Sequence, residues 1–379
     1  MKNRKKSRKN MLRPDPHIII SGGGTGGHIF PALAIARALK KKLPGARILF
    51  IGASGKMEME KVPAAGFDIK GLWISGLKRE LSLSNLMFPL KVLHSLIKAA
   101  NIIRRFKADV AVGVGGFASG PALRAAGWLG IPTLIQEQNS FPGITNKLLG
   151  KKASRICVAF EGMEKFFPPG KIIITGNPVR KEVIETEGKK DEASAFFGLK
   201  SPAPIVFVVG GSQGAYSVNA SIEKLLPEFK ENQIQLLWQT GKNFEQHAKD
   251  ACKKAAYENV KVVDFIQRMD LAYALADVVI SRAGAIAIAE LAAVRKPVIF
   301  IPLPTAAEDH QLKNARRLEA KEAALVIKDN EASEKLLPLL LNLLGDEDSR
   351  KKLEKNIGTF ATVDADEKIA DEIIALIKK

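Results

Sequence analysis

The chain has few cysteines, few aromatic residues and no long apolar run, and each shortage excludes a class of protein. Its two cysteines, Cys157 and Cys252, are too far apart in sequence to form a motif, so we expect core positions and a reducing cytoplasm. No run approaches the roughly 18 apolar residues that cross a bilayer, and no apolar segment of a signal peptide follows the basic start. Aromatic residues make up 6% of the chain, whereas a nucleic-acid module interleaves them with basic residues. Nucleic acid is therefore not an expected partner.

Positive charge is the strongest compositional signal. The formal net charge is +18, and seven basic residues precede the first acidic one, Asp15. We expect residues 1–16 to form a basic N-terminal arm. Such a charge favours an anionic partner, and with nucleic acid set aside a phosphorylated substrate or anionic lipid remains.

Strand-like apolar runs alternate with helical stretches in two blocks, and 379 residues suit two domains. The alternation predicts an α/β protein with two Rossmann-like domains, each a doubly wound parallel sheet, facing each other across a cleft. We expect the domains at residues 17–178 and 179–358, with a C-terminal helix in 359–379 that packs back on the first. The expected strands are 17–21, 46–51, 109–114, 132–136, 155–159 and 171–175, then 205–209, 235–238, 261–264, 277–280, 297–301 and 324–327.

The first strand runs into the glycine-rich turn Gly22-Gly23-Gly24-Thr25-Gly26-Gly27-His28, and a helix with Pro31 in its first turn is expected after it. A strand, a glycine loop and a helix N-terminus together present backbone N–H groups to an anion. The glycine spacing also fits a dinucleotide site, but the second strand is followed by no acid before Glu58, which argues against a nicotinamide dehydrogenase. A tight turn without a ligand is the alternative.

Polar residues at the same sheet edge are candidates for the chemistry. His28 stands where the helix begins, which disfavours the imidazolium and suits a general base; alternatively, it only caps the helix. The turn Gly115-Gly116 should lie near the first glycine turn, since strand ends share one edge. Glu137, a candidate acid, and Asn139, a candidate sugar-hydroxyl partner, end the next strand, or are loop residues that face water.

The second half of the chain contains candidate site residues in a similar arrangement. Ser281–Ala285 follows a strand and starts the helix that contains Glu290, so its N–H groups suit a diphosphate and Glu290 a ribose diol, unless Glu290 is simply solvated. Glu308-Asp309-His310-Gln311 suits sugar hydroxyls. The two Asp-x-Asp pairs lie in the helical tail, so we expect no metal and assign stabilisation of a leaving diphosphate to amides, dipoles and arginine.

Residues 72–106 mix large apolar side chains with lysines and arginines. Part of this segment has the helical spacing of ordinary core packing. The stretch 81–90 has apolar residues without clean alternation and basic neighbours on both sides, which favours contact with an anionic lipid surface.

Six motifs occur in order between about residues 18 and 325: Gly22-Gly23-Gly24-Thr25-Gly26-Gly27-His28-x-x-Pro31-Ala32, Gly115-Gly116-Phe117-Ala118-Ser119-Gly120-Pro121, Glu137-Gln138-Asn139, Gly176-Asn177-Pro178-Val179-Arg180, Gly210-Gly211-Ser212-Gln213-Gly214-Ala215 and Arg282-Ala283-Gly284-Ala285. Together they resemble the MurG family of peptidoglycan N-acetylglucosaminyltransferases. The resemblance implies a GT-B fold and, without a cofactor, inverting transfer of GlcNAc from UDP-GlcNAc to the MurNAc C4 hydroxyl of undecaprenyl-linked lipid I, giving lipid II. It also implies a peripheral protein on the anionic cytoplasmic face of the inner membrane.

The resemblance assigns roles to individual residues. It implies that His28 is the base, and Glu137 is the second catalytic candidate. The residues implied to bind substrate are Thr25, Gly26, Gly27 and Asn139 near the sugar and acceptor, Arg180, Ser212 and Ile266 at the nucleotide, Ala285, Ile286, Ala287, Ile288 and Ala289 at the diphosphate, Glu290 at the ribose, and Gln311 at the sugar hydroxyls. Two positions depart from the family pattern: Ala287 replaces a common Thr, and Gln136 a common His. Another UDP-sugar transferase of the same fold and a non-catalytic nucleotide-sugar-binding protein are the alternative functions.

Overall fold

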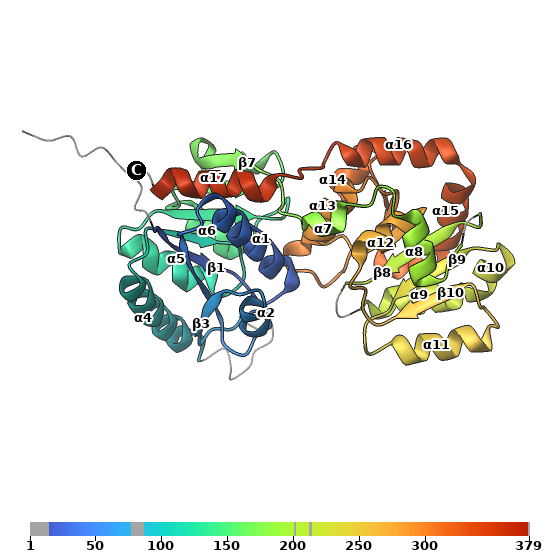
Figure 1. Cartoon of the computed structure of the whole chain (residues 1–379), viewed down its shortest axis with the longest axis horizontal. Coiled ribbons are helices and arrows are strands. Elements are labelled where there is room, and N and C mark those ends of the chain that lie inside the picture. The colour runs from blue at the N-terminus through green and yellow to red at the C-terminus, as the bar shows by residue number, and fades with distance from the viewer. Residues whose placement is uncertain (1–14, 77–86, 201, 212–213, 378–379) are drawn as a thin grey trace, which may run out of the picture. The chain divides into compact units, whose positions relative to one another are not determined.

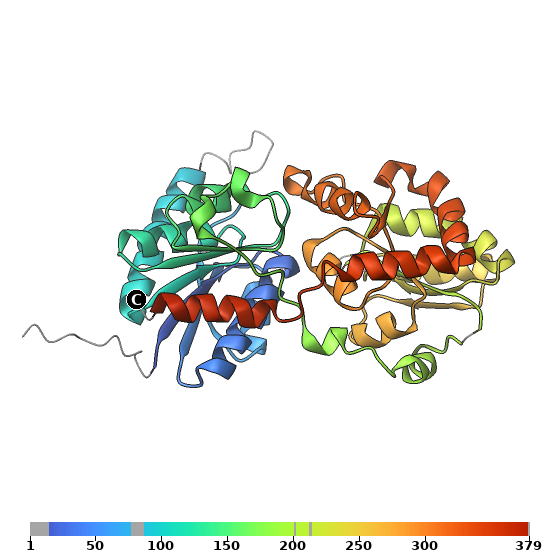
Figure 2. The ribbon, with the colours of Figure 1, turned by 90° about the horizontal axis from the view of Figure 1, so that it is seen from above.

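The computed structural model describes residues 15–76, 87–200, 202–211 and 214–377, and they divide into two compact units. Unit 1 comprises the described residues up to Gln138, Pro142–Pro178 and the C-terminal residues from Asp364. Unit 2 comprises Asn139–Phe141 and Val179–Val363. Figures 1 and 2 show that each unit is a sheet with helices on both of its faces. Of the expected basic arm, residues 1–14 lie outside the described residues.

Unit 1 is built on a seven-stranded parallel sheet. Its strands are β1 (His17–Ser21), β2 (Arg47–Ala53), β3 (Asp68–Leu72), β4 (Val110–Gly113), β5 (Thr133–Glu137), β6 (Arg155–Val158) and β7 (Ile172–Ile174). Their order across the sheet is β3-β2-β1-β4-β5-β6-β7. The helices are α1 (Gly26–Lys42), α2 (Glu58–Ala64), α4 (Phe88–Phe106), α5 (Ser119–Trp128), α6 (Ile144–Gly150) and α17 (Ala365–Ile377), with short 3-10 turns at Met163–Lys165 and Pro169–Lys171.

Successive residues of β1 enter two different cores because side chains alternate along a strand. Ile18 and Ile20 pack with residues of α1 and α17, whereas Ile19 packs with residues of α4 and α5. The C-terminal helix α17 thus completes the core of unit 1, and Figures 1 and 2 show it in red beside the blue α1. Lys42 Nζ and Asp371 Oδ1, 2.7 Å apart, join the two helices at the surface.

Unit 2 is built on a six-stranded parallel sheet. Its strands are β8 (Ile205–Val209), β9 (Gln235–Gln239), β10 (Val260–Val263), β11 (Val278–Ser281), β12 (Val298–Phe300) and β13 (Leu325–Val326), in the order β10-β9-β8-β11-β12-β13. Its helices are α7 (Lys181–Ile184), α8 (Lys190–Phe197), α9 (Tyr216–Lys224), α10 (Leu226–Glu231), α11 (Glu245–Lys254), α12 (Met269–Leu275), α13 (Ala285–Ala293), α14 (His310–Glu319), α15 (Ala332–Gly345) and α16 (Glu347–Gly358), with 3-10 turns at Ala307–Asp309 and Asp329–Glu331.

The predicted strands are all present, with ends shifted by one or two residues, but two local expectations are wrong. The structure has a strand that was not predicted, β3, because its alternating sequence Asp-Ile-Lys-Gly-Leu at the sheet edge contains no apolar run. Helix α1 begins at Gly26, so Pro31 lies in its second turn and not in the first. The early start places His28 inside the first turn.

Both cysteines are buried, as predicted. Burial raises the pKa of the Cys157 thiol to about 12 and that of Cys252 to about 11. Over the described residues, none of the helices combines the length and the apolar character that a membrane span requires.

Candidate active site

In each sheet the strand order reverses beside a glycine-containing turn. In unit 1 the neighbours β1 and β4 run into Gly22–Thr25 and Val114–Phe117. In unit 2 the neighbours β8 and β11 run into Gly210-Gly211 and Arg282–Gly284. Open parallel sheets bind ligands beyond the carboxyl ends of their strands at such a reversal. Each unit therefore has one candidate ligand site where the sequence motifs lie.

The side chain of His28 turns back onto the glycine turn before it. Its Nδ1 lies 3.1 Å from the carbonyl oxygen of Gly23 and 3.2 Å from the hydroxyl oxygen of Thr25. Because a carbonyl oxygen can only accept, we assign the ring proton to Nδ1, which donates to Gly23. Nε2 is then the acceptor atom of the ring, which is the arrangement that a general base requires.

The second glycine turn of unit 1 packs directly on the first. A Cβ atom at Gly115 would lie 2.8 Å from Nε2 of His28, and one at Gly116 would lie 2.2 Å from the Gly23 carbonyl oxygen. Both glycines have positive φ, at 94° and 85°, which disfavours any side chain. The predicted proximity of these two turns is confirmed, and Nε2 faces the Gly115 turn.

Glu137 is buried at the end of β5. Its Oε2 accepts a hydrogen bond of 2.8 Å from Nδ2 of Asn146, which lies on α6. Its neighbours are buried too: Gln136 donates to Asn177, and Gln138 Nε2 donates to the carbonyl of Val114, 2.8 Å away. The alternative that Glu137 is a loop residue facing water is therefore wrong.

Glu290 lies in the second turn of α13 with only 5% of its surface exposed. Its Oε1 is 3.1 Å from Nη2 of Arg180, and its Oε2 accepts a 3.2 Å hydrogen bond from the hydroxyl of Tyr273. Burial raises the pKa of the Glu290 carboxyl, and the nearby Arg180 opposes that rise. The interpretation of Glu290 as an ordinary solvated helix residue is therefore wrong.

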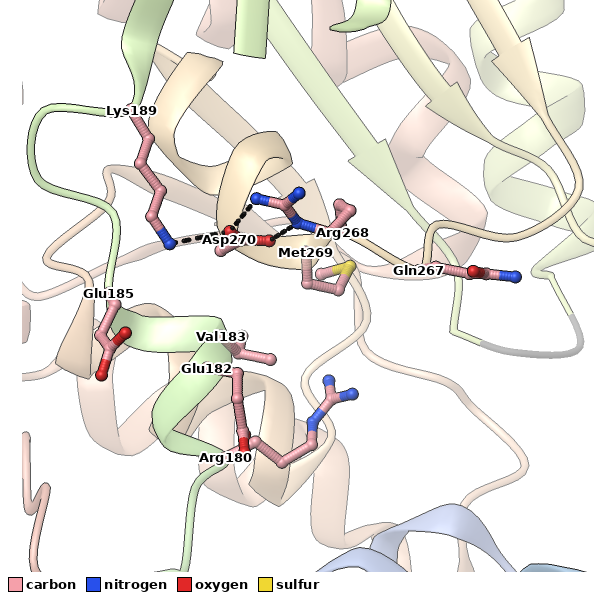
Figure 3. Close-up of a pocket in the computed structure, with 9 residues that line it drawn as sticks. All are labelled: Arg180, Glu182, Val183, Glu185, Lys189, Gln267, Arg268, Met269 and Asp270. Carbon is pink, nitrogen blue, oxygen red and sulfur yellow. Dashed lines mark hydrogen bonds and ion pairs between the residues drawn. The ribbon is translucent and has the colours of Figure 1, made fainter. Parts of the chain in front are cut away.

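Arg180 borders a pocket of about 200 Å³ in unit 2 (Figure 3), lined by Arg180, Glu182, Val183, Glu185, Lys189, Gln267, Arg268, Met269 and Asp270. Figure 3 shows Asp270 between Lys189 and Arg268, whose nitrogens lie 2.9 and 2.8 Å from Asp270 Oδ2. Hydrogen bonds from Arg268 hold the pKa of the Asp270 carboxyl well below its usual range. This cluster connects the segment after Arg180 to α12 within unit 2.

Arg282 follows β11, and its side chain makes hydrogen bonds within unit 2. It is 8% exposed, and its guanidinium donates to the carbonyls of Ile301 and Pro302 and to Ser217, and pairs with Asp329. These four partners, two after β12, one on α9 and one in the 3-10 turn at Asp329–Glu331, thereby hold the turn that precedes α13. The N–H groups at the start of a helix have no acceptor within the helix, and the first turn of α13 stays the predicted site for a diphosphate.

Comparisons with known proteins agree with this architecture. Residues 18–158 match the glycosyltransferase family 28 N-terminal domain, and residues 205–369 match the glycosyltransferase family 28 C-terminal domain. A Cytophaga hutchinsonii protein, named UDP-N-acetylglucosamine--N-acetylmuramyl-(pentapeptide) pyrophosphoryl-undecaprenol N-acetylglucosamine transferase, is 54% identical over 95% of this chain and 96% of its own. A Parabacteroides distasonis protein of the same name is 52% identical over 96% and 98%. The chain belongs to the MurG family.

A solved MurG structure shows the same fold. The crystal structure of Acinetobacter baumannii MurG superposes with a TM-score of 0.78 at 28% identity, covering 95% of this chain and 99% of that one. The predicted family, the GT-B fold class with its two parallel α/β sheets, and the predicted enzyme class are confirmed.

The remaining positions carried over from the MurG family are spread over both units. In unit 2, the backbone N–H of Ile266 donates to Gln239 Oε1 at 3.1 Å, and Gln311 Oε1 accepts from the N–H of Leu303 at 3.0 Å. Ser212 lies outside the described residues. Thr25, Gly26 and Gly27 form the start of α1 in unit 1 beside His28.

Asn139 falls in unit 2 with the two residues after it. Its Oδ1 accepts a 3.1 Å hydrogen bond from Nδ2 of Asn314, a buried residue of α14. Asn314 Oδ1 in turn accepts from both the N–H and the hydroxyl of Ser140, at 2.9 and 2.8 Å. The structure thus groups Asn139 with α14.

Two polar residues of this MurG-family chain were not recognised as site residues from the sequence. Tyr273, on α12, donates to Glu290, and Glu58, on α2, contacts the glycine turn next to His28. In the sequence, Glu58 bears only on the question of a dehydrogenase site, and Tyr273 belongs to none of the six motifs. Within the described part of the chain, no group of three or more His, Cys, Asp and Glu side chains is placed to hold a metal ion.

Proposed function

We propose that unit 2 holds UDP-GlcNAc and that His28 of unit 1 activates the acceptor hydroxyl. Because the chain belongs to the MurG family, it transfers GlcNAc from UDP-GlcNAc to lipid I, giving lipid II. The observation that supports the role of His28 is the contact of Nδ1 with the Gly23 carbonyl, because it leaves Nε2 as the acceptor.

In the proposed step, Nε2 of His28 takes the proton from the C4 hydroxyl of the acceptor MurNAc. The hydroxyl oxygen forms a bond to the anomeric carbon of GlcNAc while the bond from that carbon to the diphosphate breaks. The bonding electrons leave with UDP, and attack from the opposite face inverts the anomeric centre. The protein contributes proton transfer and the orientation of the two substrates.

The donor is assigned to the residues at the strand ends of unit 2. The first turns of α13, Ala285–Ala289, receive the diphosphate, since helix N-termini favour anions. Glu290 accepts from the ribose hydroxyls, Arg180, Ser212 and Ile266 contact the nucleotide, and Gln311 contacts the sugar. The sugar and acceptor side is assigned to Thr25, Gly26, Gly27 and Asn139.

Glu137 is the second catalytic candidate. The hydrogen bond that it accepts from Asn146 favours a supporting role over direct proton transfer.

The activity is tested by the release of UDP from UDP-GlcNAc by the purified protein, with and without a short-chain lipid I analogue. We expect release that depends on the analogue and that fails when UDP-glucose replaces UDP-GlcNAc. Release with a different acceptor would indicate another UDP-sugar transferase. Tight UDP-GlcNAc binding without acceptor-dependent release would indicate a nucleotide-sugar-binding protein and would contradict the proposal.

The exposed face of helix α4 supports a location of the protein on the membrane surface, at the cytoplasmic face where it would use a lipid-linked acceptor. Its inner face buries Ser95, Ala99 and Ile103, whereas Leu93 and Ile97 on its outer face are each 57% exposed. The same helix carries lysines at 91 and 98 and arginines at 104 and 105. An apolar stripe with basic neighbours suits anionic lipid. The predicted stretch 81–90 lies mostly outside the described residues.

We therefore expect Leu93→Glu to reduce binding to phosphatidylglycerol-containing vesicles by about 10-fold, because it removes apolar contact and adds charge that anionic lipid repels. Turnover of a water-soluble acceptor analogue should stay unchanged. Vesicle co-sedimentation measures the first effect and UDP release the second. Ile174→Glu, at a residue that is 53% exposed on β7, is the matched control. Equal vesicle binding by the L93E variant and the unmodified protein would exclude α4 as the contact.

A further inference from the structure

Glu58 is a buried carboxylate at the start of α2, with 0% of its surface exposed. Its Oε1 accepts a 2.9 Å hydrogen bond from the N–H of Ala53, and its Oε2 accepts a 2.8 Å bond from the N–H of Gly24. Burying a carboxylate is costly unless its oxygens are hydrogen-bonded. Two backbone donors therefore hold it in one position, between the end of β2 and the glycine turn after β1.

The side chain of Glu58 fits here only because two neighbouring positions are glycine. A Cβ atom at Gly23 would lie 2.2 Å from Glu58 Oε1, and one at Gly52 would lie 2.6 Å from its Cγ. Gly23 and Gly24 also have positive φ, at 155° and 87°. The glycine turn and the carboxylate are thus fitted to each other.

One peptide group joins Glu58 to His28. The N–H of Gly24, which donates to Glu58, and the carbonyl of Gly23, which lies 3.1 Å from His28 Nδ1, belong to the same planar unit. Holding its N–H in one direction therefore holds its C=O in the opposite direction, toward the imidazole.

The carbonyl matters because a second neighbour of Nδ1, the Thr25 hydroxyl, does not select a tautomer. The Thr25 hydroxyl, 3.2 Å from Nδ1, can either accept a proton from the ring or donate one to it. If it donated, the ring proton would move to Nε2, which could then no longer accept a proton from the substrate. The carbonyl accepts only, so it excludes that state.

We propose that Glu58 is a positioning residue that selects the tautomer of His28 through the Gly23–Gly24 peptide. The carboxylate orients the peptide, the peptide carbonyl keeps the ring proton on Nδ1, and Nε2 remains the acceptor. This inference rests on the proposed role of His28 as base only for its effect on turnover. The tautomer itself can be measured without activity.

The test is Glu58→Gln, which keeps the shape of the side chain but replaces one acceptor by a donor. The amide oxygen can accept from only one of the two N–H groups, so the Gly23–Gly24 peptide is no longer held in one orientation. We expect kcat to fall by about 10-fold with KM for UDP-GlcNAc unchanged, as for second-layer partners of functional histidines. The ¹⁵N NMR signals of His28, assigned with the His28→Gln variant, should show a proton partly shifted from Nδ1 to Nε2.

Glu60→Gln is the matched control, since Glu60 is exposed on the same helix. It should change neither kcat nor the ring signals. Unchanged ring signals and turnover in the E58Q variant would overturn the inference. If H28Q keeps full turnover, the proposed base is wrong, while the tautomer in E58Q still decides the role of Glu58. If E58Q does not fold, Gly52→Ala decides, because its Cβ would lie 2.6 Å from Glu58 Cγ and displace the carboxylate without altering the Gly23–Gly24 peptide. A shifted tautomer then supports the inference, and an unshifted one overturns it.

Discussion

Replacing His28 with glutamine should lower kcat for GlcNAc transfer to a lipid I analogue by roughly 10²- to 10⁴-fold, the range for loss of a general base. Glutamine has a similar size and can accept the hydroxyl hydrogen bond, but its amide oxygen does not take the proton. KM for UDP-GlcNAc should stay close to that of the unmodified protein, because the donor is assigned to residues of unit 2. Steady-state UDP release at saturating acceptor measures both quantities.

His247→Gln provides the control for this substitution. His247 lies on α11, where Nε2 is 2.9 Å from Glu223 and the side chain is 61% exposed. The proposal gives His247 no part in proton transfer or in substrate binding, so kcat should not change in this variant. Full turnover by the H28Q variant would contradict the assignment of His28 as base, whatever the control shows.

The sequence predicted the fold and the strand-end motifs well because both are local signals. Apolar runs such as Ile205–Val209 and glycine clusters such as Gly22–Gly27 can be recognised without knowing their partners. The edge strand β3 was missed because its outer position needs few apolar residues. Proline is common in the first turn of a helix, so the sequence places the helix start close to Pro31. The helix begins earlier, at Gly26, and includes two glycines.

The contacts that prepare the site were not predictable, because each joins residues far apart in the chain. Glu58 and Gly24 are 34 positions apart, and Arg180 and Glu290 are 110 apart. A lone glutamate after a strand has the same local signature whether it is solvated or buried. Only the packing of α2 against the glycine turn, and of α12 against α13 through Tyr273, separates the two cases.

The pair formed by Arg180 and Glu290 supports the proposed contact of Glu290 with the ribose of the nucleotide. Burial places the Glu290 side chain where water competes little for its oxygens, and Arg180 and Tyr273 orient them. Burial also raises the pKa of the Tyr273 hydroxyl well above its usual value, so that this group remains a donor. A carboxylate oriented in this way suits the two adjacent hydroxyls of a ribose.

Glu290→Gln should therefore lower kcat/KM for UDP-GlcNAc by about 100-fold, mainly through KM, since hydrogen bonds to a charged group contribute about 1.5–3 kcal/mol each. The pH dependence gives a second readout. Because burial raises the pKa of Glu290, the carboxylate takes up a proton at a higher pH than an exposed glutamate, and KM of the unmodified protein should rise as pH falls through that pKa. The E290Q variant has no such group, so that rise should be absent. Glu334→Gln, at an exposed residue of α15, is the control, and an unchanged KM in E290Q would contradict the ribose contact.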